Sequence, residues 1–184
     1  MKLNKRLNVV IAIDREDGST VHVHSTPIST DVFDQHYRAL SKTYVEMHAG
    51  GVGNVGPKIA YKVLRDVAKT LGCWKDPGGV EQSLIGEIYR NTMVLVPTAQ
   101  GYEQVLFYQA KQQKMIDPED IQEIEGRLVF FTCSVFLMQR HELSMLYEML
   151  LYWGVQTTAL NSTDYMNSLS TSNADANSGV TVAA

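Results

Sequence analysis

The sequence predicts a mainly α-helical domain of about six helices, with a small β part at its N-terminus and a flexible C-terminal tail. Residues 7–24 have the alternation and central turn of a β-hairpin, and the segments between 30 and 153 repeat apolar side chains at helical spacing. Residues 156–184 consist mostly of Ser, Thr, Asn, Ala and Gly, which have little apolar surface to bury. We therefore expect an α-rich globular domain over 1–155 and a low-complexity, disordered tail over 156–184.

The hairpin is predicted from its turn and from its two faces. Asp17-Gly18 is a dipeptide typical of tight turns between antiparallel strands. After it, Val21 and Val23 fall on one face of the return strand, and His22 and His24 fall on the other. The alternating apolar residues of the first strand are Leu7, Val9, Ile11 and Ile13. A hairpin alone is marginally stable in water, so this one must pack on the helices or pair with another chain.

Capping and breaking residues mark the helices. Thr30 or its neighbour Ser29 can cap the first helix, Pro57 and Pro118 stand at the first position of later helices, and Gly72 ends one of them. The helices are expected over residues 30–49, 57–71, 80–93, 102–113, 118–138 and 141–153.

Two of these helices carry further expectations. In the first helix, Tyr37 and Val45 are predicted to share the apolar face with Leu40 and Met47. The long helix is apolar nearly all round from residue 128, which indicates burial at the centre of the fold. A strand over Val129–Val135 is the competing interpretation, because β-branched and aromatic residues concentrate there.

The distribution of charge excludes several classes of partner. The formal net charge is −4, and no Lys or Arg follows Arg140, so the C-terminal part lacks the cations that bind nucleic acid. The apolar runs are shorter than the roughly 18 to 20 residues that span a bilayer. Cys73 and Cys133 are far apart and form no disulfide framework, and the N-terminus lacks the apolar core of a signal peptide. These features predict a protein of a reducing cytoplasm that binds neither nucleic acid nor membrane.

One glycine-rich segment matches a cofactor motif. Residues Gly51–Gly56 fit the dinucleotide-binding pattern, which works only between a strand and a helix of a βαβ unit. Here a helix is predicted before the motif, so we interpret the segment as a connector between helices. No cofactor is expected.

Other polar clusters also favour an ordinary structural role. His22 and His24 share a face and form a geometrically feasible two-histidine clip, but metal sites usually need three or four ligands. We therefore interpret them as surface imidazoles and expect no metal. The acidic residues between Asp117 and Glu125 are interpreted as the solvated start of a helix. Since no nucleophile, base and orienting group can be assembled from known motifs, we expect no catalytic residues and no enzyme activity.

The strongest functional signal is the segment from Leu143 to Trp153, which is rich in Met and aromatic residues. Its apolar side chains cover more than one helix face. A buried terminal helix is one interpretation, and an adaptable partner-binding surface is the other. The predicted partner-binding residues are Leu146, Met149, Leu150, Tyr152 and Trp153.

Several segments together resemble a group of small proteins from tailed bacteriophages. They are the start Met1–Ile11, residues Val80–Gln82 with the following Leu-Ile-Gly-Glu-Ile, Leu128–Thr132, and Trp153–Thr158 leading to Asn161–Tyr165. Within that group the chain is most similar to the tail assembly chaperones of long-tailed phages, which are encoded before the tape-measure protein. The resemblance implies no catalysis. It implies binding of the long helical tape measure and recruitment of tail-tube subunits in the host cytoplasm.

The alternative is a structural virion protein, a tail or connector component, whose hairpin and C-terminal arm are ordered by neighbouring subunits. Both interpretations make other virion proteins the partners, and both are compatible with a homo-oligomer.

Overall fold

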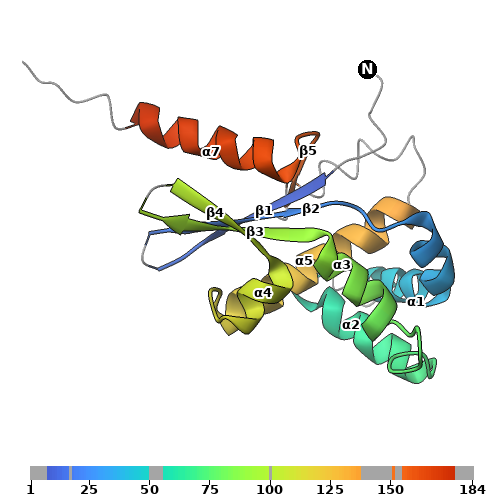
Figure 1. The fold of residues 1–184 in the computed structure, drawn as a ribbon. Coiled ribbons are helices and arrows are strands. Elements are labelled where there is room, and N and C mark those ends of the chain that lie inside the picture. The colour runs from blue at the N-terminus through green and yellow to red at the C-terminus, as the bar shows by residue number, and fades with distance from the viewer. Residues whose placement is uncertain are drawn as a thin grey trace, which may run out of the picture.

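The computed structural model describes residues 8–16, 18–49, 56–99, 101–137, 151 and 155–176. These residues form a five-stranded antiparallel sheet with helices on both of its faces (Figure 1). The prediction of a mainly α-helical fold with only an N-terminal hairpin was therefore wrong, and the fold is of the α+β kind. Among the described elements, the helices that precede β5 lie on one face of the sheet, here called the inner face, and α7 lies on the outer face.

The predicted hairpin lies in the middle of the sheet. Its register places Ile11 opposite Val23 and Ala12 opposite His22, so His22 and His24 face away from Val21 and Val23 as predicted. The strands are β1 (Asn8–Asp14), β2 (Thr20–Ser25), β3 (Thr92–Thr98), β4 (Gly101–Leu106) and β5 (Val155–Thr158), in the order β4-β3-β2-β1-β5.

Most of the helix boundaries follow the predicted caps. Within the described ranges the helices are α1 (Thr30–Ala49), α2 (Gly56–Thr70), α3 (Gly86–Arg90), α4 (Phe107–Gln112), α5 (Pro118–Leu137) and α7 (Ser162–Ala176), with a π-helical turn η2 (Glu81–Ile85) running into α3. The helix interpretation of Val129–Val135 is confirmed. The predicted helix over 141–153 lies outside the described residues except for Leu151.

The main core lies between the inner face of the sheet and α5. Its strand residues and its helix residues are apolar and have no exposed surface. Examples are Ile11, Val21, Val23 and Val94 from the strands, and Leu64 and Ile124 from the helices. At Gly126, where α5 meets the start of α2, an added Cβ would lie only 2.2 Å from the carbonyl oxygen of Pro57. The two backbones therefore touch at a position that only glycine allows.

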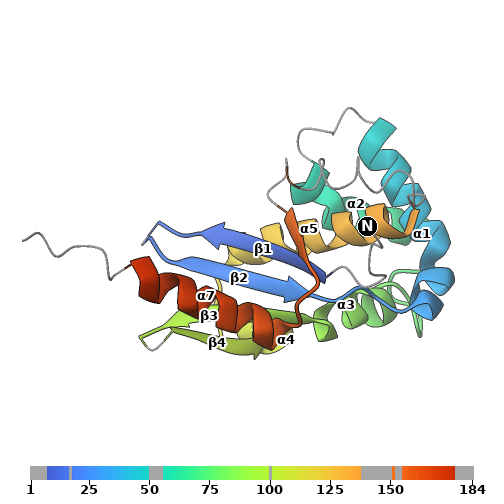
Figure 2. The ribbon, with the colours of Figure 1, turned by 90° about the horizontal axis from the view of Figure 1, so that it is seen from above.

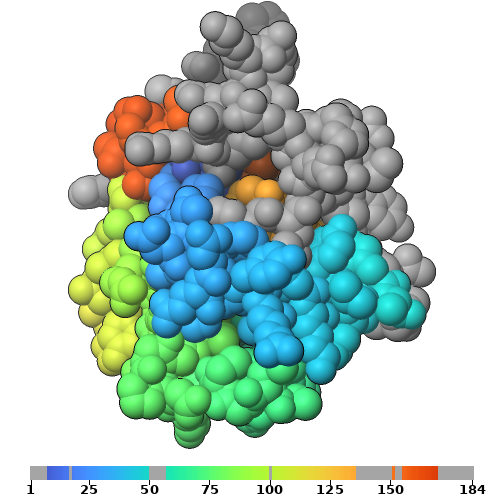
Figure 3. All heavy atoms as spheres, turned by 90° about the vertical axis from the view of Figure 1, so that its right-hand side faces the viewer, coloured from blue at the N-terminus to red at the C-terminus, as the bar shows by residue number. Residues whose placement is uncertain are grey.

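The first helix buries a different face from the predicted one. Leu40 and Met47 are buried as expected, but Tyr37 and Val45 are 55% and 59% exposed. Thr43 lies on the buried face instead, where its hydroxyl donates to the carbonyl of Ala39 at 2.7 Å and so has a partner without water. At this end of the molecule α1 also covers the loop that follows α2, and Gln35 donates to Gly78 O at 2.8 Å (Figure 3).

Residues 92–106 form two strands, although the sequence predicted a helix reaching Met93, a loop, and a helix from Tyr102. The reason is that β3 is covered on both faces. Val94 on the inner face and Leu95 on the outer face both have no exposed surface, so the strand lacks the polar alternation that marks a half-buried strand. Pro97 also lowered the expectation of a strand, but it sits near the end of β3 opposite Tyr102.

The predicted tail over 156–184 contains a strand and a helix in the structure. Val155–Thr158 pair with β1 as an edge strand, and α7 follows after a short connection. Tyr165, Met166 and Leu169 lie on one side of α7 and are half-buried. A helix of this composition needs only one narrow apolar stripe when a sheet covers it, and disorder of the tail in the isolated protein stays a prediction. The division of the chain at residue 155 stays a prediction.

Candidate functional site

The outer face of the sheet and the helix that lies on it form the candidate site. Figures 1 and 2 show α7 lying lengthwise over the strands, on the side opposite to α5. The register brings Ala12, His22, Leu95 and Gln104 into one row across β1 to β4. Leu95 is fully buried without belonging to the main core, so this face has a small apolar layer of its own.

The connection into α7 is fixed at a single carbonyl group. His24 is 2% exposed, and its Nε2 lies 2.9 Å from the carbonyl oxygen of Leu160. Because a carbonyl oxygen only accepts, Nε2 must carry the hydrogen. Asn8 Nδ2 donates to the same oxygen at 2.8 Å. Strands β1 and β2 therefore hold the chain at the residue where it turns toward α7.

Aromatic rings make the next contact between the sheet and α7. The ring of His22 lies 5.4 Å from that of Tyr102 and 6.1 Å from that of Tyr165, edge-on to both. The ring of Tyr165 also lies 6.1 Å from that of His24. We call these four residues the ring cluster. Tyr165 is the member of the ring cluster that belongs to α7. Its side chain contacts two successive residues on the outer face of β2, His22 and His24.

Burial sets the ionisation of the ring cluster. It lowers the pKa of His22, while the charge of Asp14 acts in the opposite direction. It raises the pKa of Tyr165, and Tyr102 adds to that effect. His22 Nδ1 is buried and has no hydrogen-bond partner among the described residues. Burial therefore favours the neutral form of the His22 imidazole.

Polar side chains begin the helix. Asn161 Oδ1 accepts from the backbone N–H of Asp164 at 2.9 Å, and Asn161 Nδ2 donates to the Asp164 carboxylate at 2.7 Å, which together form an N-terminal cap. Gln104 Nε2 donates to the Ser162 hydroxyl at 2.7 Å and so ties the first turn to β4. Beside this turn a cavity of about 500 Å³ opens between Leu160–Ser162 and the ends of β1 to β3.

The helix on the outer face is lightly packed. From Ser162 to Leu169 no side chain is fully buried, whereas every side chain from Leu128 to Ser134 of α5 is buried. Hydrophobic stabilisation grows with the apolar area removed from water, at about 25 cal/mol per Å². The described part of α7 therefore buries less surface than α5, and we expect α7 to open before the core unfolds.

The predicted partner-binding residues are not part of this geometry. Leu146, Met149, Leu150, Tyr152 and Trp153 all lie outside the described residues, and their role stays a prediction. Leu151, their one described neighbour, is 61% exposed.

The structure also shows what surrounds the two histidines of β2 and the glycine-rich segment. His22 and His24 are covered by α7 and are not surface imidazoles, and the described residues contain no group of three metal-ligating side chains. The helix before the glycine motif is confirmed, because α1 runs to Ala49, while residues 50–55 lie outside the described ranges.

The acidic residues at the start of α5 serve as ion-pair partners more than as a solvated run. Asp120 accepts from Arg15 at 3.2 Å, and Glu123 pairs with Arg127. Glu125 is buried and accepts from Lys111 at 2.7 Å.

Sequence reasoning missed Asn8, Gln104, Leu160 and Tyr165, because their roles depend on the unpredicted α7. The pair Asn161 and Asp164, three residues apart, was the available signal for this helix.

None of the described helices combines the length and the apolarity needed to cross a membrane. No protein-family model, curated protein or solved structure matches this chain.

Proposed function

We propose that this chain is a tail assembly chaperone of a long-tailed bacteriophage, which binds the helical tape-measure protein and recruits tail-tube subunits without catalysis. The observation that carries the proposal is the outer face of the sheet, which holds a lightly packed helix. A surface that accepts one helix through rings and a few polar groups has the chemistry to accept another. The similarity to phage chaperones in the segments Met1–Ile11 and Trp153–Thr158 supports the same function.

In this proposal α7 covers the outer face of the sheet in the free protein, and the partner's helix displaces it. The tape-measure protein is a long helix, and the ring cluster offers an aromatic pocket to one of its side chains. Opening α7 exposes His22, Tyr102 and Leu95, which together form a surface of mixed apolar and aromatic character. Aromatic residues are enriched at such interfaces.

A second binding element is proposed in the segment Leu143–Trp153, which follows α5 and precedes β5. Met, Tyr and Trp side chains there adapt to irregular partner surfaces. A chain with both elements can hold a tape-measure helix on the sheet while the second segment contacts a tail-tube subunit or another copy of the chaperone.

The alternative of a structural virion protein rests on the same C-terminal arm. Residues 155–176 add an edge strand and a helix to the sheet after the helical layer is complete. In a virion such an arm can lie on the sheet of a neighbouring subunit, since no side chain of its helix is fully buried between residues 162 and 169.

Quantitative mass spectrometry of purified phage particles tests the proposal against this alternative. A chaperone is expected in infected-cell lysates in complex with the tape-measure protein, and below one copy per particle in mature virions. A fixed number of copies in every mature particle would reject the chaperone and support the virion component.

A further inference from the structure

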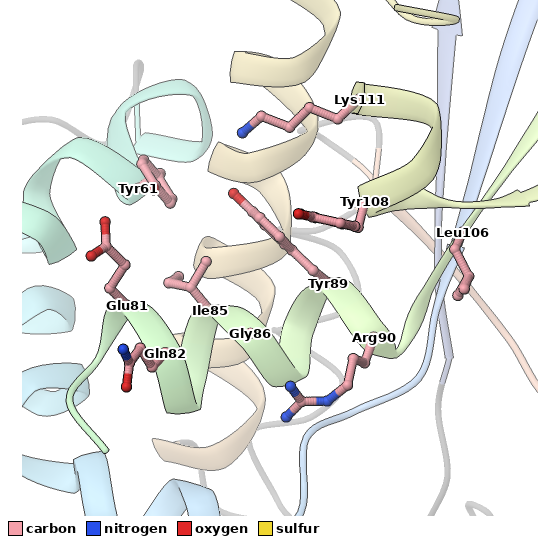
Figure 4. A pocket seen from close by; sticks show the side chains of 10 residues that line it. All are labelled: Tyr61, Glu81, Gln82, Ile85, Gly86, Tyr89, Arg90, Leu106, Tyr108 and Lys111. Carbon is pink, nitrogen blue, oxygen red and sulfur yellow. The ribbon is translucent and has the colours of Figure 1, made fainter. Parts of the chain in front are cut away.

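A second cavity lies on the far side of the molecule from the ring cluster's helix. It has a volume of about 560 Å³ and lies between α2, the continuous helix formed by η2 and α3, and α4 (Figure 4). Ligand pockets commonly have volumes of 300 to 1,000 Å³. We call it the tyrosine cleft, because Tyr61, Tyr89 and Tyr108 line it from three different elements.

The tyrosine rings are held in place from behind. Tyr89 stands edge-on to the ring of the fully buried Phe107 at 5.0 Å, and its hydroxyl donates to the buried carboxylate of Glu125. Tyr61 stands edge-on to Trp74 at 6.2 Å. Flat apolar walls that are fixed before binding suit a planar apolar group, because little side-chain freedom is lost when it enters.

Two cations line the cleft, and they differ in their partners. Lys111 Nζ donates to Glu125 Oε1 at 2.7 Å, so its charge is balanced by a buried carboxylate. Arg90 has no carboxylate within 4 Å among the described residues. In Figure 4, Lys111 lies above the tyrosines and Arg90 lies below them, at the lower edge of the helix formed by η2 and α3. The free positive charge of the cleft is therefore the guanidinium at the α3 end.

A glycine makes room for this guanidinium. Gly86 precedes Arg90 by one helical turn, and a Cβ at Gly86 would lie 3.3 Å from Arg90 Nη1. The Arg90 side chain thus runs back along the helix toward Gly86, below the tyrosine rings in the view of Figure 4.

The wall itself has an unusual backbone. In η2 the N–H of Ile85 donates to the carbonyl of Val80 at 2.9 Å, five residues earlier. Such π-helical turns are rare and frequently occur at functional sites. Here the turn brings Glu81 and Gln82 onto the same wall as Gly86 and Arg90.

We propose that the tyrosine cleft binds a planar aromatic acid, with the ring against the tyrosines and the carboxylate on the Arg90 guanidinium. A guanidinium matches a carboxylate in a two-pronged geometry, and an unpaired one beside apolar walls selects an anion over a neutral or cationic molecule of the same shape. The acid has two sources, a free small molecule or the C-terminal carboxylate of a peptide that ends in an aromatic residue.

The test is ligand-observed ¹⁹F NMR with the full-length protein and three probes that share one ring and differ in the charge of a short side chain: 5-fluoroindole-3-acetate, the neutral 5-fluoroindole-3-acetamide and the cationic 5-fluorotryptamine. We expect the acid to bind at least tenfold more tightly than either of the others. Two tripeptides ending in tryptophan, one with a free and one with an amidated C-terminus, then distinguish the sources. Tighter binding of the free-acid tripeptide than of indole-acetate assigns the site to peptide C-termini, and weaker binding assigns it to small acids.

Three variants make the test specific. Arg90→Gln is expected to abolish the preference for the acid, whereas Arg38→Gln, which removes an exposed guanidinium outside the cleft, is expected to keep it. Gly86→Ala is expected to weaken binding of the acid by displacing the guanidinium, while the thermal midpoint stays equal or rises because alanine favours a helix. Equal binding of the three probes, absence of binding at millimolar concentration, or unchanged preference in Arg90→Gln would overturn the proposal.

Discussion

At the scale of single residues, the ring cluster makes the attachment of α7 sensitive to acid. Burial lowers the pKa of His22 in the folded chain, so the imidazole takes up a proton more readily once α7 has left. A group with a depressed folded pKa stabilises the docked state above its ordinary pKa of about 6.5, and this contribution is lost as the pH falls below that value. His24 also faces Tyr165, and its Nε2 donates to the carbonyl oxygen of Leu160.

Lowering the pH from 7.5 to 5.5 is therefore expected to reduce the hydrogen-exchange protection of α7 amides, after correction for the intrinsic exchange rate, before the amides of α5 respond. His22→Gln should remove most of this pH dependence. The matched control is His48→Gln, since His48 is exposed at the end of α1. Equal pH dependence in both variants would show that His22 does not control the attachment.

A second residue-scale feature is the buried carboxylate behind the tyrosine cleft. Burial and the neighbouring charge of Glu125 raise the pKa of Tyr89, whose hydroxyl donates to that carboxylate. Burial also raises the pKa of Tyr61. A raised folded pKa stabilises the native state below the ordinary tyrosine value of about 10, and the stabilisation is lost as the pH rises above it.

Urea unfolding between pH 8 and pH 11 should therefore show stability falling above pH 10. Tyr89→Phe is expected to lower the free energy of unfolding by about 1–2 kcal/mol at pH 8, because one hydrogen bond to a charged group is lost. The same variant should make the alkaline decline shallower, by up to about 1.4 kcal/mol per pH unit for one proton. Tyr108→Phe, at a 55% exposed position, is the control that should retain the neutral-pH stability. An unchanged alkaline slope in Tyr89→Phe would contradict the assignment.

At the scale of elements, the contact between α2 and α5 depends on one glycine. A Cβ at Gly126 would lie 2.2 Å from Pro57 O and 2.9 Å from Lys58 O, and backbone atoms cannot move aside as a flexible side chain can. Gly86 also lies in a helix, but the atom nearest to its added Cβ is the flexible end of Arg90 at 3.3 Å.

The two glycines therefore predict opposite effects of the same substitution. Gly126→Ala should lower the free energy of unfolding by about 3 kcal/mol, at the upper end of overpacking effects. Gly86→Ala should leave it unchanged or raise it by up to about 1 kcal/mol, because alanine is the better helix former. Denaturant melts of both variants check this pair of predictions, and a similar change in both would contradict a close backbone contact between α2 and α5 at Gly126.

The elements that could be predicted from the sequence are those whose signals are local. Asp17-Gly18 marks the hairpin, and Pro57, Gly72 and Pro118 mark helix ends that the structure confirms at or within one residue. The long helix around Leu128 was recognised because it is apolar on all sides and longer than a strand.

The remaining elements depend on contacts that are distant in sequence. Leu95 has no polar alternation around it because β3 is covered on both faces, and one of its covers is α7, residues 162–176. That helix in turn is stable only on the sheet, since its own sequence offers a narrow stripe around Tyr165. Because β3 and α7 cover each other, neither could be predicted without the other. The ring cluster, which joins the sheet to α7, could not be predicted either. One feature of the candidate site was predicted from the sequence. His22 and His24 lie on the same face of β2, because side chains alternate with a two-residue period along a strand.

At the scale of the whole molecule, the fold separates stability from recognition. Among the described elements, the inner face of the sheet and the helices that precede β5 form the core that holds the chain folded, and the outer face carries α7, with no fully buried side chain from 162 to 169. The proposed function makes this outer face the surface for the partner's helix, and α7 competes for it. A competitor that occupies a site most of the time lowers the apparent affinity of the partner by the fraction of time the site is free.

The most direct test is the affinity of the tape-measure protein for the full-length chain and for its Tyr165→Ala variant, measured by titration calorimetry at neutral pH. Loss of the ring contacts of Tyr165 weakens the docking of α7 by about 0.5–1.5 kcal/mol, so the account predicts binding that is about two- to tenfold tighter in the variant. Tyr37→Ala, at an exposed position on α1, should bind as the unmodified chain does. Equal or weaker binding by Tyr165→Ala would contradict the claim that α7 and the tape-measure helix share one surface.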